Sequence, residues 1–473
     1  MNQIILMKDI RLMLKDLKFQ IFFLILVALF ILSAISSAVT YHSHNDEYQA
    51  DLNRFNELVS NENYTKLANL INHRRLNVLS QPSPAILFSS YSSFPDKINS
   101  RVIFYSPTLD KYGQSGNGVF RLNWFFILGI LTGFIMLVMS FETISQEKRS
   151  GTLRLMSVYG FKRQKILWIK YISYMLLYLI IIIPPALASM ILFFALTGTW
   201  SAVFMWKFLL ILLISIPFAS FFVWLGIFIS MGKNYRNAIV MIVFIWLFFV
   251  IIVPQSASIF GKQLSPIKTT TEYRQARSSA FWDEFQAWNE REDDRAGSNT
   301  PENLEIRAAA YHTSEEKRDV VVQKEVEDYM RQTMMIQKIA SISPFAQFEM
   351  ISEIVFDKGL YMLNYMQDTT KRSVNQITNL MIEQDSRDEN SMHLFYGWAE
   401  MDSNVLSFFY GSDKVAFSHE LFEQPNLLFV TEIETDDAWG KMVKIMMRLL
   451  PILILNLVLM AGAVVKFERL DIR

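Results

Sequence analysis

The stretch FETISQEKRSGTLRLMSVYGFKRQKILWIK, from Phe141 to Lys170, joins two long apolar runs through a loop that is rich in Lys and Arg. Hydrophobic residues make up 52% of the 473-residue chain, which is more than a soluble globular protein usually carries. A helix needs about 20 apolar residues to cross a hydrocarbon core about 30 Å thick. We therefore predict an all-α polytopic membrane protein in which the quoted stretch connects two spans.

Six apolar runs are long enough to cross a bilayer as helices. They lie at residues 19–39, 123–141, 167–196, 208–231, 238–259 and 445–465. Two long polar segments, 40–122 and 260–444, follow the first and the fifth of these runs. The sequence therefore predicts six transmembrane helices with two large insertions.

The distribution of Lys and Arg over the short loops predicts the orientation of the spans. Basic residues resist translocation and collect on the cytoplasmic side of a membrane. They are frequent before the first span, in the quoted loop and after the last span, at Lys8, Arg11, Lys15, Lys18, Lys148, Arg149, Arg154, Lys162, Arg163, Lys165, Lys466, Arg469 and Arg473. We therefore place both termini, the loop 142–166 and the tail 466–473 in the cytoplasm, and both insertions outside.

Residues 1–18 alternate apolar and basic side chains at helical spacing. The apolar positions are Ile10, Met13, Leu14 and Leu17, and they fall opposite Lys8, Arg11, Lys15 and Lys18. This pattern is typical of an amphipathic helix on the inner leaflet, and a polar lead-in whose charges only set the topology is the alternative. A cleaved signal peptide is disfavoured, because its apolar core has about 7–15 residues and the run 19–39 is longer.

The two insertions are expected to be extracytoplasmic and mainly helical. The segment 260–444 contains 19 Lys and Arg and 32 Asp and Glu, which gives it a net charge of −13. Such an acidic surface does not suit nucleic acid. The chain contains no cysteine, so the insertions must be held together by packing or by docking rather than by disulfides.

The spans themselves contain few side chains that could bind an ion or a polar substrate. Their central portions contain no Asp, Glu, Lys, Arg or His, whereas ion-driven transporters usually place ionisable residues there. Asn456 is the most polar side chain at mid-depth, and it either bonds a neighbouring helix or contacts a substrate along its path. Any energy for work across the membrane is therefore expected to enter from outside the bilayer.

No local motif predicts an enzyme. The segment GIFISMGKN, from Gly226 to Asn234, resembles a phosphate-binding loop but has one residue too many between its glycines and Asn in place of Ser or Thr. His42 and His44 with Asp46 could form a metal pair, although His residues on a solvated turn are more often bystanders. We expect no metal, no cofactor and no catalytic residue in this chain.

The quoted loop carries several polar residues in a distinctive order. They are Glu142, Glu147, the triplet Gly151-Thr152-Leu153, the pair Lys162-Arg163, and Lys170. This order resembles the first cytoplasmic loop of ABC-2 type exporter permeases, which has a membrane-exit acid, a Glu before Gly-Thr-Leu, a short helix, an Arg and a Lys. Where that family often has Pro after the short helix, this chain has Tyr159-Gly160-Phe161.

Two further segments are similar to one branch of that family. QPSPAIL at 81–87 and SPFAQFEMISE at 343–353 look like segments of the branch with large outer insertions. That branch includes the gliding-motility and nitrous-oxide-reductase maturation permeases. The specific loop motif covers about 30 residues, whereas the six-span plan resembles the family over the whole chain.

The resemblance implies that the loop docks on a separate cytoplasmic ABC ATPase, which would hold the ATP and magnesium. The residues expected to form this coupling site are Glu142, Glu147, Gly151, Thr152, Leu153, Leu155, Met156, Tyr159, Arg163 and Lys170. Gly151 permits a tight turn, Thr152 can cap a helix, and the four apolar residues would form a ridge that enters a groove. The two acidic residues could pair with Arg149, Arg154 or Arg163.

The expected function is that of the permease subunit of an exporter in a bacterial cytoplasmic membrane. A second permease, either a copy or a sibling, and two ATPase subunits would complete the complex, and ATP binding would change the packing of the two six-helix halves. The alternative is a mechanotransmission or envelope-assembly scaffold, in which ATP moves the outer domains and no substrate crosses. For the loop itself, the plain alternative is a topology anchor.

Overall fold

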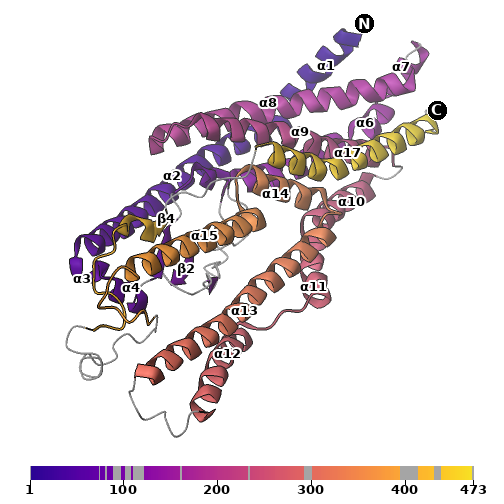
Figure 1. Cartoon of the computed structure of the whole chain (residues 1–473). Helices are drawn as coiled ribbons and strands as arrows, with labels where there is room; N and C mark the ends of the chain where they lie inside the picture. Colours follow the sequence, from indigo (N-terminus) through magenta and orange to yellow (C-terminus); the bar gives the residue numbers. More distant parts are fainter. Residues whose placement is uncertain are drawn as a thin grey trace.

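A computed structural model shows the arrangement of these segments (Figure 1). The structure describes residues 2–73, 75–79, 82–88, 97–101, 108–109, 122–159, 162–232, 235–291, 301–394, 414–430 and 438–470. In these ranges, long helices lie side by side in a slanted bundle, and the strands lie toward one end of it. The described part of the chain is therefore mainly helical, as predicted.

Six helices in the described residues are long and apolar enough to cross a membrane, and each contains most of one predicted run. Four are single helices, namely α2 (Leu17–Ser60), α8 (Arg163–Thr197), α9 (Ala202–Ser230) and α17 (Ala438–Glu468). The second span comprises η2 (Phe126–Leu131), α5 (Thr132–Ser140) and α6 (Thr143–Arg149). The fifth span contains most of α10 (Tyr235–Leu247), followed by η3 (Phe248–Ile252) and α11 (Val253–Leu264). The prediction of a six-span polytopic protein is confirmed.

Helix α9 lies at the centre of the bundle because it is apolar on all sides. It packs against α5, α8 and α17, and Phe208, Phe218 and Phe222 on it are completely buried. Pro217 lies within α9 without ending it. Membrane helices tolerate such a proline when neighbouring groups satisfy the backbone around it.

Two spans contain a π-helical segment, in which the wider turns leave backbone carbonyls available to side-chain donors. In η2, the Thr132 hydroxyl donates to the Ile127 carbonyl at 2.7 Å, and Trp246 Nε1 donates to the Ile130 carbonyl at 3.2 Å. In η3, the Ser343 hydroxyl donates to the carbonyl of Phe249 at 2.5 Å. These bonds join the second span to the fifth and the fifth to the second insertion.

Helix α1 (Asn2–Lys15) precedes the first span, and Asp16 separates the two helices. The Asp16 carboxylate accepts a hydrogen bond from the Lys18 backbone N–H at 3.1 Å and so caps α2. The predicted N-terminal helix is therefore present, whereas its position on the inner leaflet stays a prediction. Figure 1 places both termini and α7 (Thr152–Val158) toward the same end of the bundle, as an even number of spans requires.

The two insertions share a small β-sheet toward the opposite end of the bundle (Figure 1). Its order is β3 (Thr108–Leu109), β2 (Lys97–Arg101), β1 (Arg75–Leu79), β4 (Phe429–Val430). Strand β4 comes from the second insertion and pairs parallel with β1, placing Asn77 opposite Phe429. Beside the sheet, the Phe422 N–H donates to the Thr65 carbonyl at 2.8 Å. The segments predicted as two separate helical domains are therefore joined, through a sheet that we did not predict.

The remaining helices belong to the two insertions. They are α3 (Glu62–Thr65), α4 (Leu67–His73) and η1 (Pro84–Phe88) in the first, and α12 (Thr270–Arg291), α13 (Pro301–Ala340), α14 (Pro344–Val355), α15 (Gly359–Asp385) and η4 (Pro425–Leu428) in the second. Helices α12 and α13 pack together as a long hairpin, and ion pairs such as Lys317 with Glu284 cross it. Ser343 caps α14, and Pro344 occupies its first turn, where a proline is tolerated because it needs no hydrogen-bond donor.

Helix α14 belongs to the second insertion by sequence but packs inside the bundle. Phe348 stacks on Phe218, near the middle of the 29-residue α9, with ring centroids 4.8 Å apart. Phe356, just after α14, lies 5.1 Å from Phe208, which is nearer the start of α9. Helix α14 therefore runs antiparallel to α9 with its N-terminus deepest. The segment 260–444, predicted to be extracytoplasmic throughout, includes a helix that packs between membrane spans.

Candidate functional site

The quoted loop folds into α6 and α7, joined by a tight turn at Ser150 and Gly151. Gly151 has a φ of +72°, which is left-handed and free of strain for glycine. The hydroxyls of Ser150 and Thr152 each donate to the Glu147 carbonyl at 3.2 Å. The expected turn is therefore present, and Thr152 satisfies a carbonyl at the end of α6 as well as opening α7.

The apolar side chains of α7 point in different directions. Leu153 is completely buried against the bundle, and Met156 is half-buried against the same core. Leu155 is 57% exposed and Tyr159 71% exposed, and the neighbouring Val158 is 76% exposed. The predicted ridge is therefore wrong in part: Leu153 anchors the loop from inside, whereas Val158, which we did not predict, joins Leu155 and Tyr159 on the outer surface.

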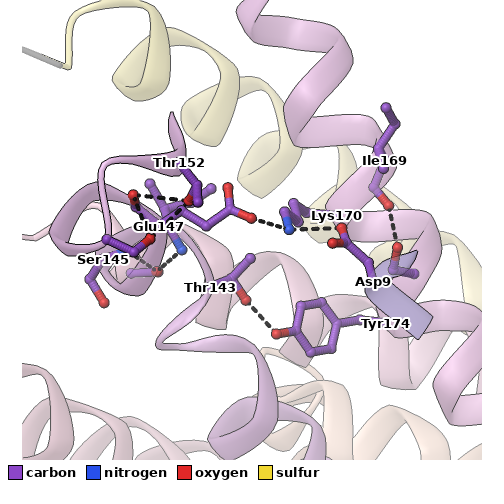
Figure 2. A network of polar contacts seen from close by, with 12 residues as sticks. Asp9, Thr143, Ser145, Glu147, Thr152, Ile169, Lys170 and Tyr174 are labelled. Carbon is purple, nitrogen blue, oxygen red and sulfur yellow. Dashed lines mark hydrogen bonds and ion pairs between the residues drawn. The ribbon is translucent and has the colours of Figure 1, made fainter. Parts of the chain in front are cut away.

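A cluster of three charged side chains attaches the loop to the third span and to the N-terminal helix (Figure 2). Lys170 of α8 lies between the carboxylates of Glu147 on α6 and Asp9 on α1 and pairs with both, the distance to Asp9 being 2.7 Å. The side chains of Lys170, Glu147 and Asp9 are 7%, 16% and 12% exposed. Removing one member of such a buried cluster leaves an uncompensated charge.

The cluster differs from the ion pairs predicted for the loop. Glu147 pairs with Lys170 and not with Arg149, Arg154 or Arg163. Lys170 and Glu147 had been singled out by the family resemblance, but Asp9 had not. Asp9 is one of two acidic residues, with Asp16, in a segment whose basic charges were assigned to topology, so nothing in its local sequence signals this role.

Glu142 and Arg163 secure the two ends of the loop. The Glu142 carboxylate accepts from Lys18 Nζ at 3.1 Å, which ties the start of α6 to the first span. Arg163 Nη1 donates to the carbonyls of Glu468 and Leu470, at 2.6 and 3.0 Å, at the end of the sixth span. Both residues therefore connect the loop to helices distant in the sequence.

Hydrogen bonds beneath α6 connect it to the third and fourth spans. The Thr143 hydroxyl donates to Tyr174 Oη of α8 at 2.6 Å, inside the protein (Figure 2). The Ser230 hydroxyl, at the end of α9, accepts from the N–H groups of Ile144 and Ser145 at 2.7 and 3.1 Å. Buried bonds of this kind hold α6 in one position relative to two spans, so a displacement of the loop must move those spans or break the bonds.

Asn456 has a structural partner. Its Nδ2 donates to the Pro217 carbonyl of α9 and to the Ile452 carbonyl, each at 2.9 Å. Its Oδ1 is buried and has no hydrogen-bond donor in the part of the chain that the structure describes. The structure therefore gives Asn456 the helix-bonding role, and contact with a substrate stays a prediction.

The two family-like segments of the insertions meet inside the bundle. Phe88, which directly follows QPSPAIL and ends η1, lies 6.2 Å from Phe348 and stacks on Phe356 at 4.9 Å between ring centroids. Phe125, which precedes the second span, is 6.1 Å from Phe88. Aromatic pairs at these distances stabilise a packed core beyond their buried area. This aromatic cluster joins both insertions to the spans.

Two weaker candidates from the sequence do not develop into sites. Among the residues that the structure describes, no group of three or more His, Cys, Asp or Glu could hold a metal ion. His42 shares a hydrogen bond of 3.2 Å with the Leu196 carbonyl. The glycine-containing segment begins within helix α9, and its Lys233 and Asn234 lie outside the described residues.

Six candidate spans, with a loop bonded to four of them, define a polytopic membrane protein. Residues 3–472 match the model of the ABC-2 family transporter protein, so the chain belongs to the ABC-2 transporter family. No curated protein and no solved structure matches the chain. Family membership and the six candidate spans make it a multi-pass permease subunit of an ABC transporter.

Proposed function

We propose that this permease couples ATP hydrolysis by a separate cytoplasmic ABC ATPase to export of a substrate across the membrane. One observation carries the proposal: α7 and the residue after it expose Leu155, Val158 and Tyr159, whereas the loop behind them is held by Leu153 and by the Lys170 cluster. An exposed apolar patch on a rigid support is suited to docking in a groove of another protein.

The contacts beneath the loop provide a route for the force. Pressure on α7 would reach α6 directly, and α6 is bonded to the third span through Thr143 and to the fourth through Ser230. The Lys170 cluster would carry the same displacement to α1. ATP and magnesium would be held by the ATPase, and a second permease, identical or related, would complete the translocation path in a bacterial cytoplasmic membrane with both termini inside.

Replacement of the exposed patch tests the docking step. Leu155→Ser combined with Tyr159→Ser should reduce capture of the partner ATPase about tenfold or more, because loss of two central apolar contacts typically costs at least 1 to 2 kcal/mol of binding. Val320→Ser, at a position 65% exposed on α13, is the matched control and should leave capture unchanged. Normal capture and turnover by the double variant would leave the loop as a topology anchor.

A second function of another class is supported by the joined insertions. Because the β1–β4 pairing and the aromatic cluster at Phe88 connect both insertions to the spans, a movement of the spans would also move the outer region. In a mechanotransmission scaffold this movement would itself be the output. ATPase activity of the complex in liposomes distinguishes the two: stimulation by a transported lipid, peptide or hydrophobic compound supports export, and turnover indifferent to all of them supports the scaffold.

A further inference from the structure

Helix α1 turns one face toward the protein. It lies along α8, and Met13 and Leu14 pack against the core of the bundle. Asp9 pairs with Lys170 of α8 at 2.7 Å (Figure 2). This face is therefore covered by protein, and it would have to leave the bundle before it could enter a lipid leaflet.

The opposite face of α1 carries a row of cations. Lys8, Arg11 and Lys15 follow one another at spacings of three and four residues, so they lie on one side of the helix, and all three are exposed. Met7 and Leu12, which are 55% and 58% exposed, lie on either side of this row. We call Lys8, Arg11 and Lys15 the basic stripe.

The protein does not neutralise the basic stripe. Lys8 attracts Glu147 electrostatically, but in the part of the chain that the structure describes no ion pair joins the three side chains to a carboxylate. The two acids of this segment are engaged elsewhere, Asp9 with Lys170 and Asp16 as the cap of α2. Like charges at these spacings repel one another, so anions from outside the chain would stabilise the stripe.

The stripe lies at the level expected for lipid headgroups. Lys170, the partner of Asp9, lies near the start of the third span. Two residues earlier, Trp168 is 41% exposed and makes edge-to-face pairs with Tyr171 and Trp224, each with ring centroids 5.6 Å apart. Trp and Tyr are enriched at the headgroup level of a membrane. Because Asp9 is level with these aromatic residues, so is the middle of α1.

We propose that the basic stripe of α1 binds the anionic headgroups of membrane lipids. Clusters of Lys and Arg beside a membrane span attract such headgroups electrostatically, and the exposed Met7 and Leu12 would contact the adjoining acyl chains. The position of the stripe, level with the interfacial aromatic residues, favours lipid over a protein as its occupant.

Bound lipid would also act on the loop 142–166. Asp9 and Glu147 share Lys170, so headgroups that hold α1 in place also hold Asp9 beside the loop. Lipid binding and the Lys170 cluster therefore stabilise each other. An effect of lipid on ATP turnover rests on the proposed coupling to an ATPase, whereas lipid binding itself does not.

The test of binding uses the full-length chain, purified in a neutral detergent. Phosphatidylglycerol, added in mixed micelles, should raise the melting temperature more than phosphatidylcholine does, because a ligand of the folded state stabilises it. In the triple variant Lys8→Gln/Arg11→Gln/Lys15→Gln, the phosphatidylglycerol concentration that gives half of this rise should increase at least about tenfold.

A matched control removes three other exposed cations from the same end of the chain. Arg154→Gln/Lys162→Gln/Lys165→Gln changes the net charge equally and should keep the wild-type response. Equal losses in the two triple variants would overturn the proposal, because the general charge of this end would then attract the lipid. A wild-type chain that responds alike to both lipids would also overturn it. Gln is well tolerated on a helix surface, and the melting temperature without lipid reports whether the stripe variant folds.

The partner ATPase provides a separate measurement. We expect the stripe variant to capture the ATPase normally, while its ATP turnover no longer depends on phosphatidylglycerol. Loss of capture with an unchanged lipid response would place the stripe against the ATPase and contradict the proposal. Turnover that keeps its lipid dependence would refute the link to the loop. The melting experiment needs no ATPase, so failure of lipid binding and failure of the proposed coupling are distinguishable.

Discussion

Substitution of Lys170 by methionine should destabilise the permease strongly, because it removes the cation that pairs with both Asp9 and Glu147. Methionine keeps most of the side-chain volume, so the change isolates the charge. Removing one partner of a buried ion pair costs about 3–5 kcal/mol, and all three side chains here are at least four-fifths buried. The free energy of unfolding, measured by denaturant titration of the detergent-purified chain, should fall by about that amount.

Two further variants make this prediction specific. Lys18→Met removes the cation from the Glu142 pair, in which the lysine is 52% exposed, and should cost about 0 to 1 kcal/mol. Combining Lys170→Met with Asp9→Asn and Glu147→Gln removes all three charges and should recover much of the lost stability, since no uncompensated charge is left. If Lys170→Met were no more destabilising than Lys18→Met, the cluster would not anchor the loop.

Two other substitutions test packing and topology. Gly226→Ala should cost about 1–3 kcal/mol of stability by overpacking, because its Cβ would lie 1.9 Å from Ser140 Oγ. Gly440→Ala is the control, since a Cβ there would meet nothing within 4 Å. Equal melting temperatures of the two variants would contradict the tight approach of α9 to α5. A single cysteine at Ser60 should react with an impermeant thiol reagent in intact cells and one at Ser150 should not, and labelling at Ser150 from outside would reverse the proposed orientation.

The spans were predictable from the sequence because each is a long apolar run whose signal does not depend on tertiary contacts. The turn at Gly151 was also predictable, since a tight backbone favours glycine. The directions in which the side chains of α7 point were not predictable. On a helix of seven residues, the apolar residues surround the axis, so spacing alone cannot show that Leu153 points inward and Leu155 outward.

The position of α14 was hidden for a different reason. Gln347, Glu349 and Glu353 interrupt its apolar residues, so a search for long uncharged runs passes over it. Its place in the bundle depends on partners such as Phe218 and Arg448, which are distant in sequence. The sheet was missed because β4 has only two residues and forms only where β1 is available to pair with it.

The pairing of β1 with β4 also constrains the order in which the protein is made. Asn77 is synthesised early, but its strand partner Phe429 emerges only after five of the six spans. At synthesis rates of about 5–20 residues per second, the interval is on the order of tens of seconds. During biogenesis, the edge of β1 that later pairs with β4 therefore stays unpaired until the chain is nearly complete. In that time it can pair with strands of other chains, so the cell benefits if another protein covers this edge.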